Sequence, residues 1–334
     1  MQDVARLPEK DRKDLFRETS QSMGIRESII EKDFWVCWVL DYLFQDSRWK
    51  DTLIFKGGTS LSKAYGAIER FSEDVDLVID WKLLGCTKEE AFQDRSSKKQ
   101  TAFCDEVSKK AVQFLQSNFV PILQEELKDR LGDKVLIMQD KQVVSIEYPR
   151  SFSIGYIRPE IILEIGPKAL HEPNELVKIQ SYAAEQFPQQ FNQAYTEVRT
   201  VSAERTFWEK ATILHQEAHR DVGKQLPLRY SRHYYDLFRL SKTDVMQKAL
   251  EQIELLADVA KFKIKLFRSA WARYEDAKPG TLKLSPAGHN LEKLKKDYES
   301  MKAMLFGQIP GFEEIIKGLA SLEDEINIRG NSKR

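Results

Sequence analysis

Two short stretches decide the fold of this chain, FKGGTS at residues 55–60 and RFSEDVDLVI at residues 70–79. The first is typical of an apolar strand that ends in a glycine turn, and the second of a strand that carries carboxylates. Side chains alternate along a strand, so Asp74 and Asp76 point to one face while Val75 and the apolar residues after it point to the other. We therefore expect a strand, turn, helix and strand unit whose second strand has one acidic and one apolar face.

The two aspartates are costly neighbours unless a cation lies between them, because like charges repel. Magnesium is the natural candidate, since it prefers hard oxygen ligands. A glycine turn that opens a helix offers backbone N–H groups to a phosphate. The glycine pair and the aspartate pair each also have an ordinary explanation. Gly57 and Gly58 suit any tight turn, and acidic residues are common on exposed edge strands. Their order and spacing together favour a metal-dependent site that acts on a nucleoside triphosphate.

The composition is typical of a globular protein. Hydrophobic residues make up 42% and charged residues 31% of the 334 residues, a length with room for two domains. Lys and Arg total 52, as do Asp and Glu, so net charge gives no argument for a polyanionic partner without excluding a local basic face. The N-terminus is polar, and the most apolar run, Phe34–Leu43, is too short to span a bilayer. Three cysteines without disulfide or zinc spacing indicate a reduced, cytoplasmic setting.

The pattern along the chain predicts an α+β fold. Helical spacing covers residues 9–47 and 87–131, and helices continue almost without interruption from Ser202. Thr59 or Ser60 can cap a helix that runs to about Ile68. We expect a small mixed sheet flanked by helices in residues 1–201 and a helical domain in residues 202–334. Strands are predicted at residues 52–55, 75–79, 134–138, 143–148, 160–165 and 195–201.

The arrangement resembles the signature of the nucleotidyltransferase superfamily, and more narrowly it is similar to the AbiEii/AbiGii toxin family. The similarity rests on Phe55–Lys63 with Arg70–Leu77, on ERTFWEKAT at residues 204–212 and on SRHYYDL at residues 231–237. The resemblance extends from about residue 30 to about residue 245. It implies a nucleotidyltransferase core and a Mg²⁺-dependent enzyme that moves a nucleoside monophosphate from a nucleoside triphosphate to an acceptor. It also implies a toxin of a bacterial toxin–antitoxin or abortive-infection system.

By this resemblance, Asp74 and Asp76 are metal ligands, and a third carboxylate is expected on a later strand. Glu160 and Glu164 share one face of the predicted strand at 160–165, and we choose Glu164 because it lies deeper in the strand. The alternative for Glu164 is a solvent-facing or salt-bridged residue. The resemblance assigns nucleotide binding to Lys56, Gly57, Gly58, Thr59, Ser60, Arg70 and Ser72, of which Arg70 and Ser72 could equally stabilise a turn.

Lys210 and Asp236 join Asp74 and Asp76 as the catalytic residues that the resemblance implies. Taken alone, Lys210 would be a solvated helix lysine, and Asp236 a helix carboxylate paired with Arg232 or Arg239. The family places a functional lysine and a functional aspartate in these motifs. The lysine could reach a phosphate or a base, and the aspartate could orient the acceptor or the lysine.

His215 and His219 are spaced for one face of a helix, with Glu217 between them. The His-Glu-x-x-His order of a zinc helix is absent and no third ligand is evident in the sequence. A packing or surface role is therefore favoured.

The residues do not decide the acceptor. RNA, including tRNA, and a protein hydroxyl are both open, and the resemblance also implies a cognate antitoxin as a partner. Two other functions stay as alternatives, a nucleotide-binding regulator without transfer activity and a kinase-type phosphotransferase. A kinase would transfer label from the γ-phosphate rather than from the α-phosphate.

Overall fold

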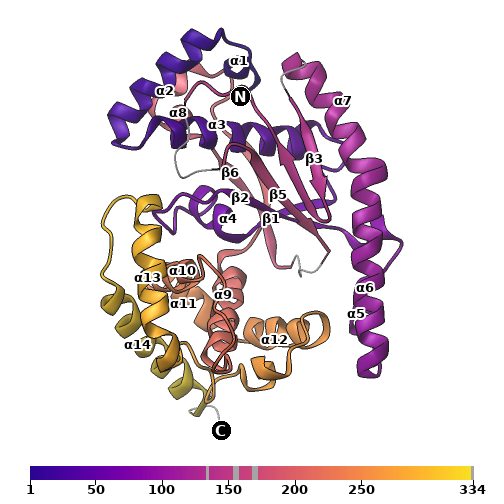
Figure 1. Cartoon of the computed structure of the whole chain (residues 1–334), viewed down its shortest axis with the longest axis vertical. Coiled ribbons are helices and arrows are strands. Elements are labelled where there is room, and N and C mark those ends of the chain that lie inside the picture. Colours follow the sequence, from indigo (N-terminus) through magenta and orange to yellow (C-terminus); the bar gives the residue numbers. More distant parts are fainter. Residues whose placement is uncertain (133–134, 153–157, 168–171, 332–334) are drawn as a thin grey trace. The chain divides into compact units, whose positions relative to one another are not determined.

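The computed structural model describes residues 1–132, 135–152, 158–167 and 172–331. It contains two compact units (Figure 1). The division of the chain into domains 1–201 and 202–334 stays a proposal. Within the described ranges, no helix is both long enough and apolar enough to cross a membrane. What we call the sheet unit comprises Met1–Ala64, Phe71–Glu90 and Thr101–Val201, and what we call the helical unit comprises Tyr65–Arg70, Ala91–Gln100 and Ser202–Arg334.

A mixed sheet organises the sheet unit, and among the described residues it has seven strands in the order β3-β4-β5-β2-β1-β7-β6. β2 runs parallel to β5 and β1 runs parallel to β7, while the other neighbouring strands are antiparallel. The predicted fold class, a mixed sheet flanked by helices and followed by a helical C-terminal part, is confirmed. The strands are β1 (Leu53–Lys56), β2 (Asp74–Ile79), β3 (Ile137–Asp140), β4 (Val143–Ile146), β5 (Ile161–Gly166), β6 (Asn174–Ile179) and β7 (Thr196–Val201).

Strand β6 was missing from the sequence prediction. It lies at an edge of the sheet, where Leu176 is 58% exposed. Its sequence, NELVKI, mixes polar and apolar residues on both faces, so it lacks the alternation that marks a half-buried strand. At the opposite edge, the predicted strand at 134–138 begins with Lys134, which lies outside the described residues.

Helices pack on the sheet and extend beside it. α3 contacts α2 and α8 and also strands β5 and β7. In Figure 1, α6 and α7 follow one another as a long rod, and α7 packs on β3. α2 ends at Gly24, whose left-handed φ of 66° splits the predicted helical stretch at 9–47. The helices are α1 (Gln2–Ala5), α2 (Glu9–Met23), α3 (Glu27–Asp41), α4 (Gly57–Lys63), α5 (Lys88–Phe92), α6 (Ser97–Phe114), α7 (Val120–Leu131) and α8 (Tyr182–Gln186), with π-helical η1 (Tyr42–Asp46) and η3 (Leu115–Phe119) and 3₁₀-helical η2 (Trp81–Leu84) and η5 (Pro188–Gln190).

Helix α3 is the central helix of this core, and its twelve consecutive residues Ile29–Leu40 are all buried. The Phe34 ring centroid lies 5.3 Å from that of Phe16 and 5.1 Å from that of Trp35, and Trp35 stacks on Tyr148 at 5.8 Å. Aromatic pairs at such distances contribute about 0.5–1.5 kcal/mol each beyond the burial of their surface. A charged residue inside this helix must therefore find a partner, because water cannot reach it.

Helix α9 organises the helical unit. It contacts α10, α11 and α12, and α10 in turn contacts α13 and α14. The buried Trp208 indole on α9 donates to the Ala249 carbonyl at 3.2 Å, which ties α9 to α11. The helices are α9 (Ala203–Ala218), α10 (Ser231–Leu240), α11 (Asp244–Glu251), α12 (Glu254–Leu266), α13 (Leu291–Met301) and α14 (Phe312–Asn331), with 3₁₀-helical η6 (Ala270–Ala272), η7 (Tyr274–Asp276), η8 (Gly288–Asn290) and η9 (Lys302–Met304).

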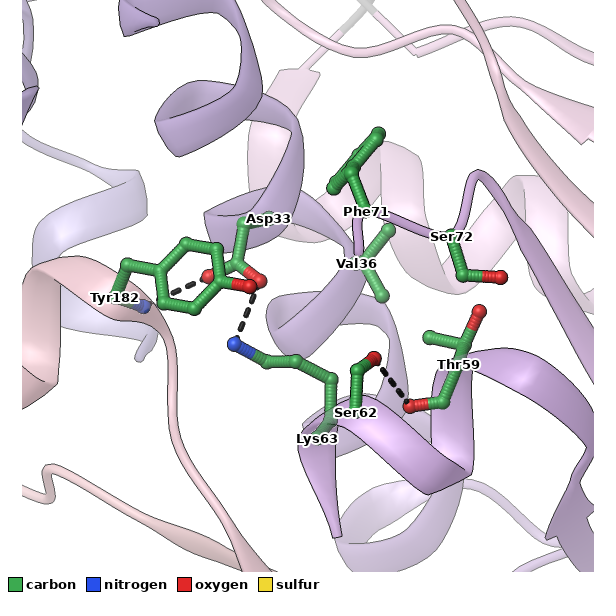
Figure 2. Close-up of a pocket in the computed structure, with 8 residues that line it drawn as sticks. All are labelled: Asp33, Val36, Thr59, Ser62, Lys63, Phe71, Ser72 and Tyr182. Carbon is green, nitrogen blue, oxygen red and sulfur yellow. Dashed lines mark hydrogen bonds and ion pairs between the residues drawn. The ribbon is translucent and has the colours of Figure 1, made fainter. Parts of the chain in front are cut away.

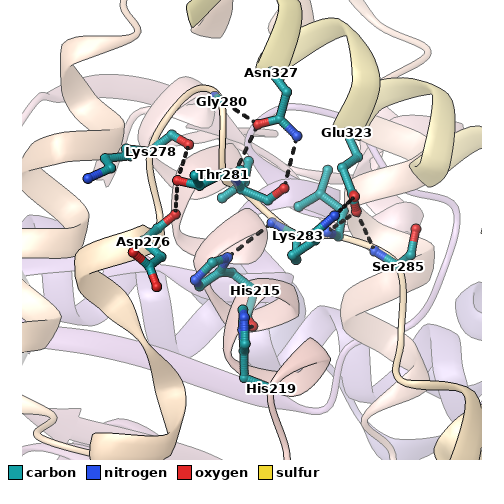
Figure 3. A network of polar contacts seen from close by, with 12 residues as sticks. His215, His219, Asp276, Lys278, Gly280, Thr281, Lys283, Ser285, Glu323 and Asn327 are labelled. Atoms are coloured by element: carbon teal, nitrogen blue, oxygen red, sulfur yellow. Dashed lines mark hydrogen bonds and ion pairs between the residues drawn. The ribbon is translucent and has the colours of Figure 1, made fainter.

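A polar network fixes the loop at residues 277–287 to α9 and α14 (Figure 3). His215 Nδ1 accepts a hydrogen bond from the Lys283 backbone N–H at 3.0 Å, and His215 Nε2 lies 2.9 Å from the Arg273 carbonyl. Glu323 accepts from the backbone N–H groups of Leu284 and Ser285 at 2.6 and 3.0 Å. Both ring nitrogens of His215 thus bind backbone, in agreement with the packing role favoured above. Burial lowers the pKa of His215 to about 4, so the imidazole is neutral.

Candidate functional site

Strands β1, β2 and β5 bring three predicted site residues into one row. Asp76 pairs with Lys56 on one side and with Glu164 on the other. Residues paired on neighbouring strands point to the same face, so these three side chains are neighbours. Asp74 lies two residues earlier on the same face, while Val75 between the aspartates is fully buried. Glu164 is exposed.

The three carboxylates offer the donor chemistry that Mg²⁺ requires, namely oxygen atoms on adjacent strands. In the described part of the chain, no three His, Cys, Asp or Glu side chains are arranged to enclose a metal ion. The strand register places Asp76 beside Glu164. Their side chains would have to rotate to bring their oxygens onto one ion. In donor type and in strand register, the residues present fit the metal.

Gly57, in the first motif, lies against the side chain of Asp76, in the second. Its φ is +85°, a left-handed conformation that favours glycine. A Cβ atom at this position would lie only 1.9 Å from Asp76 Oδ2. From the sequence, Gly57 is explained by the tight turn and by the approach of a phosphate to its backbone. The structure adds another reason, which is that the Asp76 carboxylate occupies the space of the missing side chain.

The hydroxyls of the glycine turn bind backbone carbonyls. Thr59 Oγ1 donates to the Asp74 carbonyl, and Ser60 Oγ donates to the Gly57 carbonyl at 2.9 Å. The predicted cap is wrong, because α4 begins at Gly57 after an extended Lys56 and no side chain caps it. The positive φ of Gly57 makes the turn from strand to helix directly. Thr59 and Ser60 would have to leave these carbonyls in order to donate to a phosphate.

A small pocket opens beside the glycine turn (Figure 2). At its side, Lys63 Nζ forms an ion pair with Asp33 Oδ1 at 2.6 Å and lies 3.7 Å from the centroid of the Tyr182 ring. The Tyr182 backbone N–H donates to the other Asp33 oxygen at 2.7 Å. Burial alone would lower the pKa of Lys63, but the Asp33 carboxylate raises it above its usual value. The pocket is lined by Asp33, Val36, Thr59, Ser62, Lys63, Phe71, Ser72 and Tyr182.

A second buried ion pair lies at the start of β2. Lys32 Nζ is 3.6 Å from Glu73 Oε1, and both side chains are almost completely buried. Lys32 also donates to the Arg158 carbonyl at 2.9 Å, and Glu73 accepts from the Arg158 backbone N–H at 2.8 Å. Sequence analysis missed Lys32 and Asp33. The available signal was a run of three charged residues, 31–33, inside a helix that is apolar on every side.

The helical unit contains another group of predicted residues. Arg70 binds both Asp236 oxygens, from Nε at 2.6 Å and from Nη2 at 2.9 Å. Lys210 Nζ lies 2.8 Å from Asp236 Oδ2 and 3.2 Å from His233 Nδ1. All four residues are buried. Asp236 therefore binds two residues far away in the sequence, whereas helical spacing pointed to Arg232 or Arg239, and Arg239 forms an ion pair with Glu69 at 2.9 Å.

Burial and mutual electrostatics shift the pKa values in this group. Burial alone would raise the pKa of Asp236, but Arg70 and Lys210 hold it well below its usual range. Burial lowers the pKa of Lys210, as does Arg70, while Asp236 opposes the shift. Burial and the Lys210 charge lower the pKa of His233 far below its ordinary value, so its ring is neutral and accepts from Lys210. The group thus holds two basic side chains, Arg70 and Lys210, on one carboxylate, Asp236.

Comparisons with known proteins describe the chain as a whole. The sequence model of the family described as "Nucleotidyl transferase AbiEii toxin, Type IV TA system" matches residues 38–318. Among solved structures, JHP933 from Helicobacter pylori is 15% identical, with 92% of this chain and 95% of that chain covered and a TM-score of 0.45. MenT4, a nucleotidyltransferase toxin from Mycobacterium tuberculosis, is 16% identical, with 93% and 98% covered and a TM-score of 0.43. Similarity at that level carries no argument about function, and no curated protein matches the sequence.

Proposed function

This chain belongs to the AbiEii nucleotidyltransferase toxin family of type IV toxin–antitoxin systems, and we propose that it transfers a nucleoside monophosphate from a nucleoside triphosphate to an RNA hydroxyl. Membership makes the chain a nucleotidyltransferase and implies a cognate antitoxin. Dependence on Mg²⁺ and the choice of RNA, with tRNA as one candidate, are parts of the proposal. The observation that carries the metal-dependent transfer is the row of Lys56, Asp76 and Glu164, with the Asp76 carboxylate in the space where Gly57 lacks a side chain.

We assign Mg²⁺ binding to Asp74, Asp76 and Glu164, whose oxygens match its preferences. When bound, the metal would neutralise the triphosphate and activate the acceptor hydroxyl for attack on the α-phosphate. Lys56 lies in the same row and supplies a positive charge on the face that the carboxylates occupy. Attack of the hydroxyl oxygen on the α-phosphorus forms one P–O bond as the bond from that phosphorus to the α–β bridging oxygen breaks. Pyrophosphate leaves with the bridging oxygen, and the hydroxyl proton passes to water.

We assign phosphate recognition to Arg70 and Lys210 as well. Both are basic groups of the kind that bind phosphate oxygens, and both are held by one carboxylate, Asp236. Asp236 fixes the direction of both cations, and the neutral His233 accepts from Lys210. In this proposal Asp236 orients Lys210, one of the two roles that the family resemblance suggested. Gly57, Gly58, Thr59, Ser60 and Ser72 complete the proposed nucleotide-binding set.

A labelling screen tests the proposal. The purified chain is incubated with each α-³²P-labelled nucleoside triphosphate, Mg²⁺, and either total RNA or total protein from a bacterial lysate. We expect label in RNA, abolished by chelation of Mg²⁺ and reduced about a hundredfold or more by Asp76→Asn. Asp297→Asn is the matched control, because Asp297 binds the start of α10 and belongs to neither predicted set.

The other outcomes separate the alternatives. Label in protein alone would show that the acceptor is wrong while transfer is right. Transfer of γ-label without α-label would indicate a kinase-type phosphotransferase. Binding of the nucleotide without metal-dependent transfer to RNA or protein would indicate a regulator without chemistry, and would overturn the proposed function.

A further inference from the structure

Three consecutive charged residues of α3, Glu31, Lys32 and Asp33, are buried in a helix whose other interior residues are apolar. They lie before residue 38, where the family match begins. Each of the three side chains forms hydrogen bonds or an ion pair with a different segment of the sheet unit. A buried charge is costly, so three in succession need an explanation.

Asp33 holds the glycine turn. It binds Lys63, the last residue of α4, and the first residue of that helix is Gly57, which lies against the Asp76 carboxylate. The Lys63 ammonium is further confined by the Tyr182 ring, and both charged side chains of the pair are at most 5% exposed. A shift at Lys63 is therefore transmitted along two turns of helix to the contact between Gly57 and Asp76.

Lys32 holds the two strands that carry the carboxylates. Its partner Glu73 directly precedes Asp74 at the start of β2. Lys32 and Glu73 also take both backbone polar groups of Arg158, three residues before β5, the strand of Glu164. One ion pair thus sets the entry of β2 and the approach to β5 at the same time.

Stability is a weak reason for these ion pairs. Well-packed apolar residues of similar volume usually stabilise a core as well as a buried ion pair does, or better, because the charges lose their hydration. An ion pair with directed hydrogen bonds instead fixes one relative orientation of the elements that it joins. Orientation is the property that a metal and phosphate site needs, since the reacting groups must be placed to within a fraction of an ångström.

We propose that Lys32 and Asp33 are positioning residues, which set the glycine turn and the carboxylate strands in the arrangement that binds the nucleoside triphosphate. This inference rests on the proposed function. Glu31 has the same burial on the same helix, but it accepts from the backbone N–H groups of Ser151 and Phe152, a segment without any predicted site residue. Glu31 is therefore the internal control.

The test separates positioning from folding. Asp33→Asn alone leaves the Lys63 charge buried and can unfold the chain, so the decisive variant is the double change Asp33→Asn with Lys63→Met, which removes both charges. We expect it to melt close to the wild type and to bind an equimolar mixture of α-³²P-labelled nucleoside triphosphates with Mg²⁺ about tenfold to a hundredfold more weakly. Glu31→Gln, at equal burial, should bind within about twofold of the wild type.

Hydrogen exchange gives a readout that does not depend on activity. In the double variant, amides of residues 57–63 should exchange faster than in the wild type, while those of α7 should not. In the corresponding pair Lys32→Met with Glu73→Gln, the faster exchange should fall on residues 74–79. Wild-type nucleotide affinity and wild-type exchange in the folded double variants would overturn the positioning role. If the wild type itself binds no nucleotide, the proposed function fails, and exchange alone still decides whether Lys32 and Asp33 fix these segments.

Discussion

A methyl group on Gly57 is the sharpest perturbation that the structure offers. In Gly57→Ala the new Cβ would lie 1.9 Å from Asp76 Oδ2, and ordinary contact begins near 3.4 Å. Oδ2 therefore has to move by about 1.5 Å, and the Asp76 Cγ and Cβ atoms at 2.7 and 3.0 Å must follow. Misplacement of a reacting group by about 1 Å costs on the order of a hundredfold in rate. We expect Gly57→Ala to lower Mg²⁺-dependent α-label transfer by about a hundredfold or more.

The effect on stability should be smaller, because a carboxylate at the end of a side chain can turn away. The left-handed φ of +85° costs an alanine about 1–2 kcal/mol of unfolding free energy. Gly24→Ala is the matched control, with a φ of +66° and no atom within 4 Å of the added Cβ. Urea unfolding should show similar losses for both variants, and the transfer assay should show a loss for Gly57→Ala alone. Equal transfer by the two variants would refute the reasoning.

Three further predictions concern charges. Asp236→Asn leaves two buried basic groups without their carboxylate and should lower the unfolding free energy by about 3–5 kcal/mol. The control Asp297→Asn weakens hydrogen bonds at the start of α10 and should cost about 1 kcal/mol. Equal losses of the two variants in urea unfolding would contradict the buried pairing. His215 has its pKa lowered from 6.5 to about 4 in the folded chain, so the stability that it contributes is fully present above pH 6.5 and is lost as the pH falls towards 4. His215→Gln should reduce the dependence of the melting temperature on pH between those two values. An unchanged dependence would show that another group is responsible. Glu164→Gln should raise the Mg²⁺ concentration needed for half-maximal transfer, but less than Asp76→Asn does, because Asp76 lies in the centre of the row and Glu164 at its exposed end. An unchanged Mg²⁺ requirement of Glu164→Gln in a metal titration would remove Glu164 from the ligand set.

The parts of the site that depend on local sequence could be predicted from the sequence. The alternation of β2 placed Asp74 and Asp76 on one face. The same rule put Glu160 and Glu164 on one face of the later strand, and depth in the strand selected Glu164, which the register then puts beside Asp76. Family resemblance singled out Lys210 and Asp236 although each, taken alone, looked like a surface residue of a helix. Their roles in binding and catalysis stay predictions.

Long-range partners could not be predicted in this way. Arg70 and Asp236 are 166 residues apart, and no periodicity along the chain links them. The buried pairs of Lys32 and Asp33 depend on α3 being covered on every side, which is a property of the assembled core. Helical spacing did not point to Arg70 or Lys210 as partners of Asp236, because it considers only neighbours on one exposed helix, whereas the burial of α10 makes stronger, distant partners available.

The two units have a consequence for how this chain could be divided or recombined. Each is assembled from several pieces of sequence, and the chain passes between them at residues 64/65, 70/71, 90/91, 100/101 and 201/202. A fragment that ends at residue 201 would carry away Arg70 and leave the Asp236 carboxylate with one of its two cations. The helical unit is therefore not a module that gene fusion could exchange at a single junction. A swap between relatives would have to transplant Tyr65–Arg70 and Ala91–Gln100 together with everything after Val201.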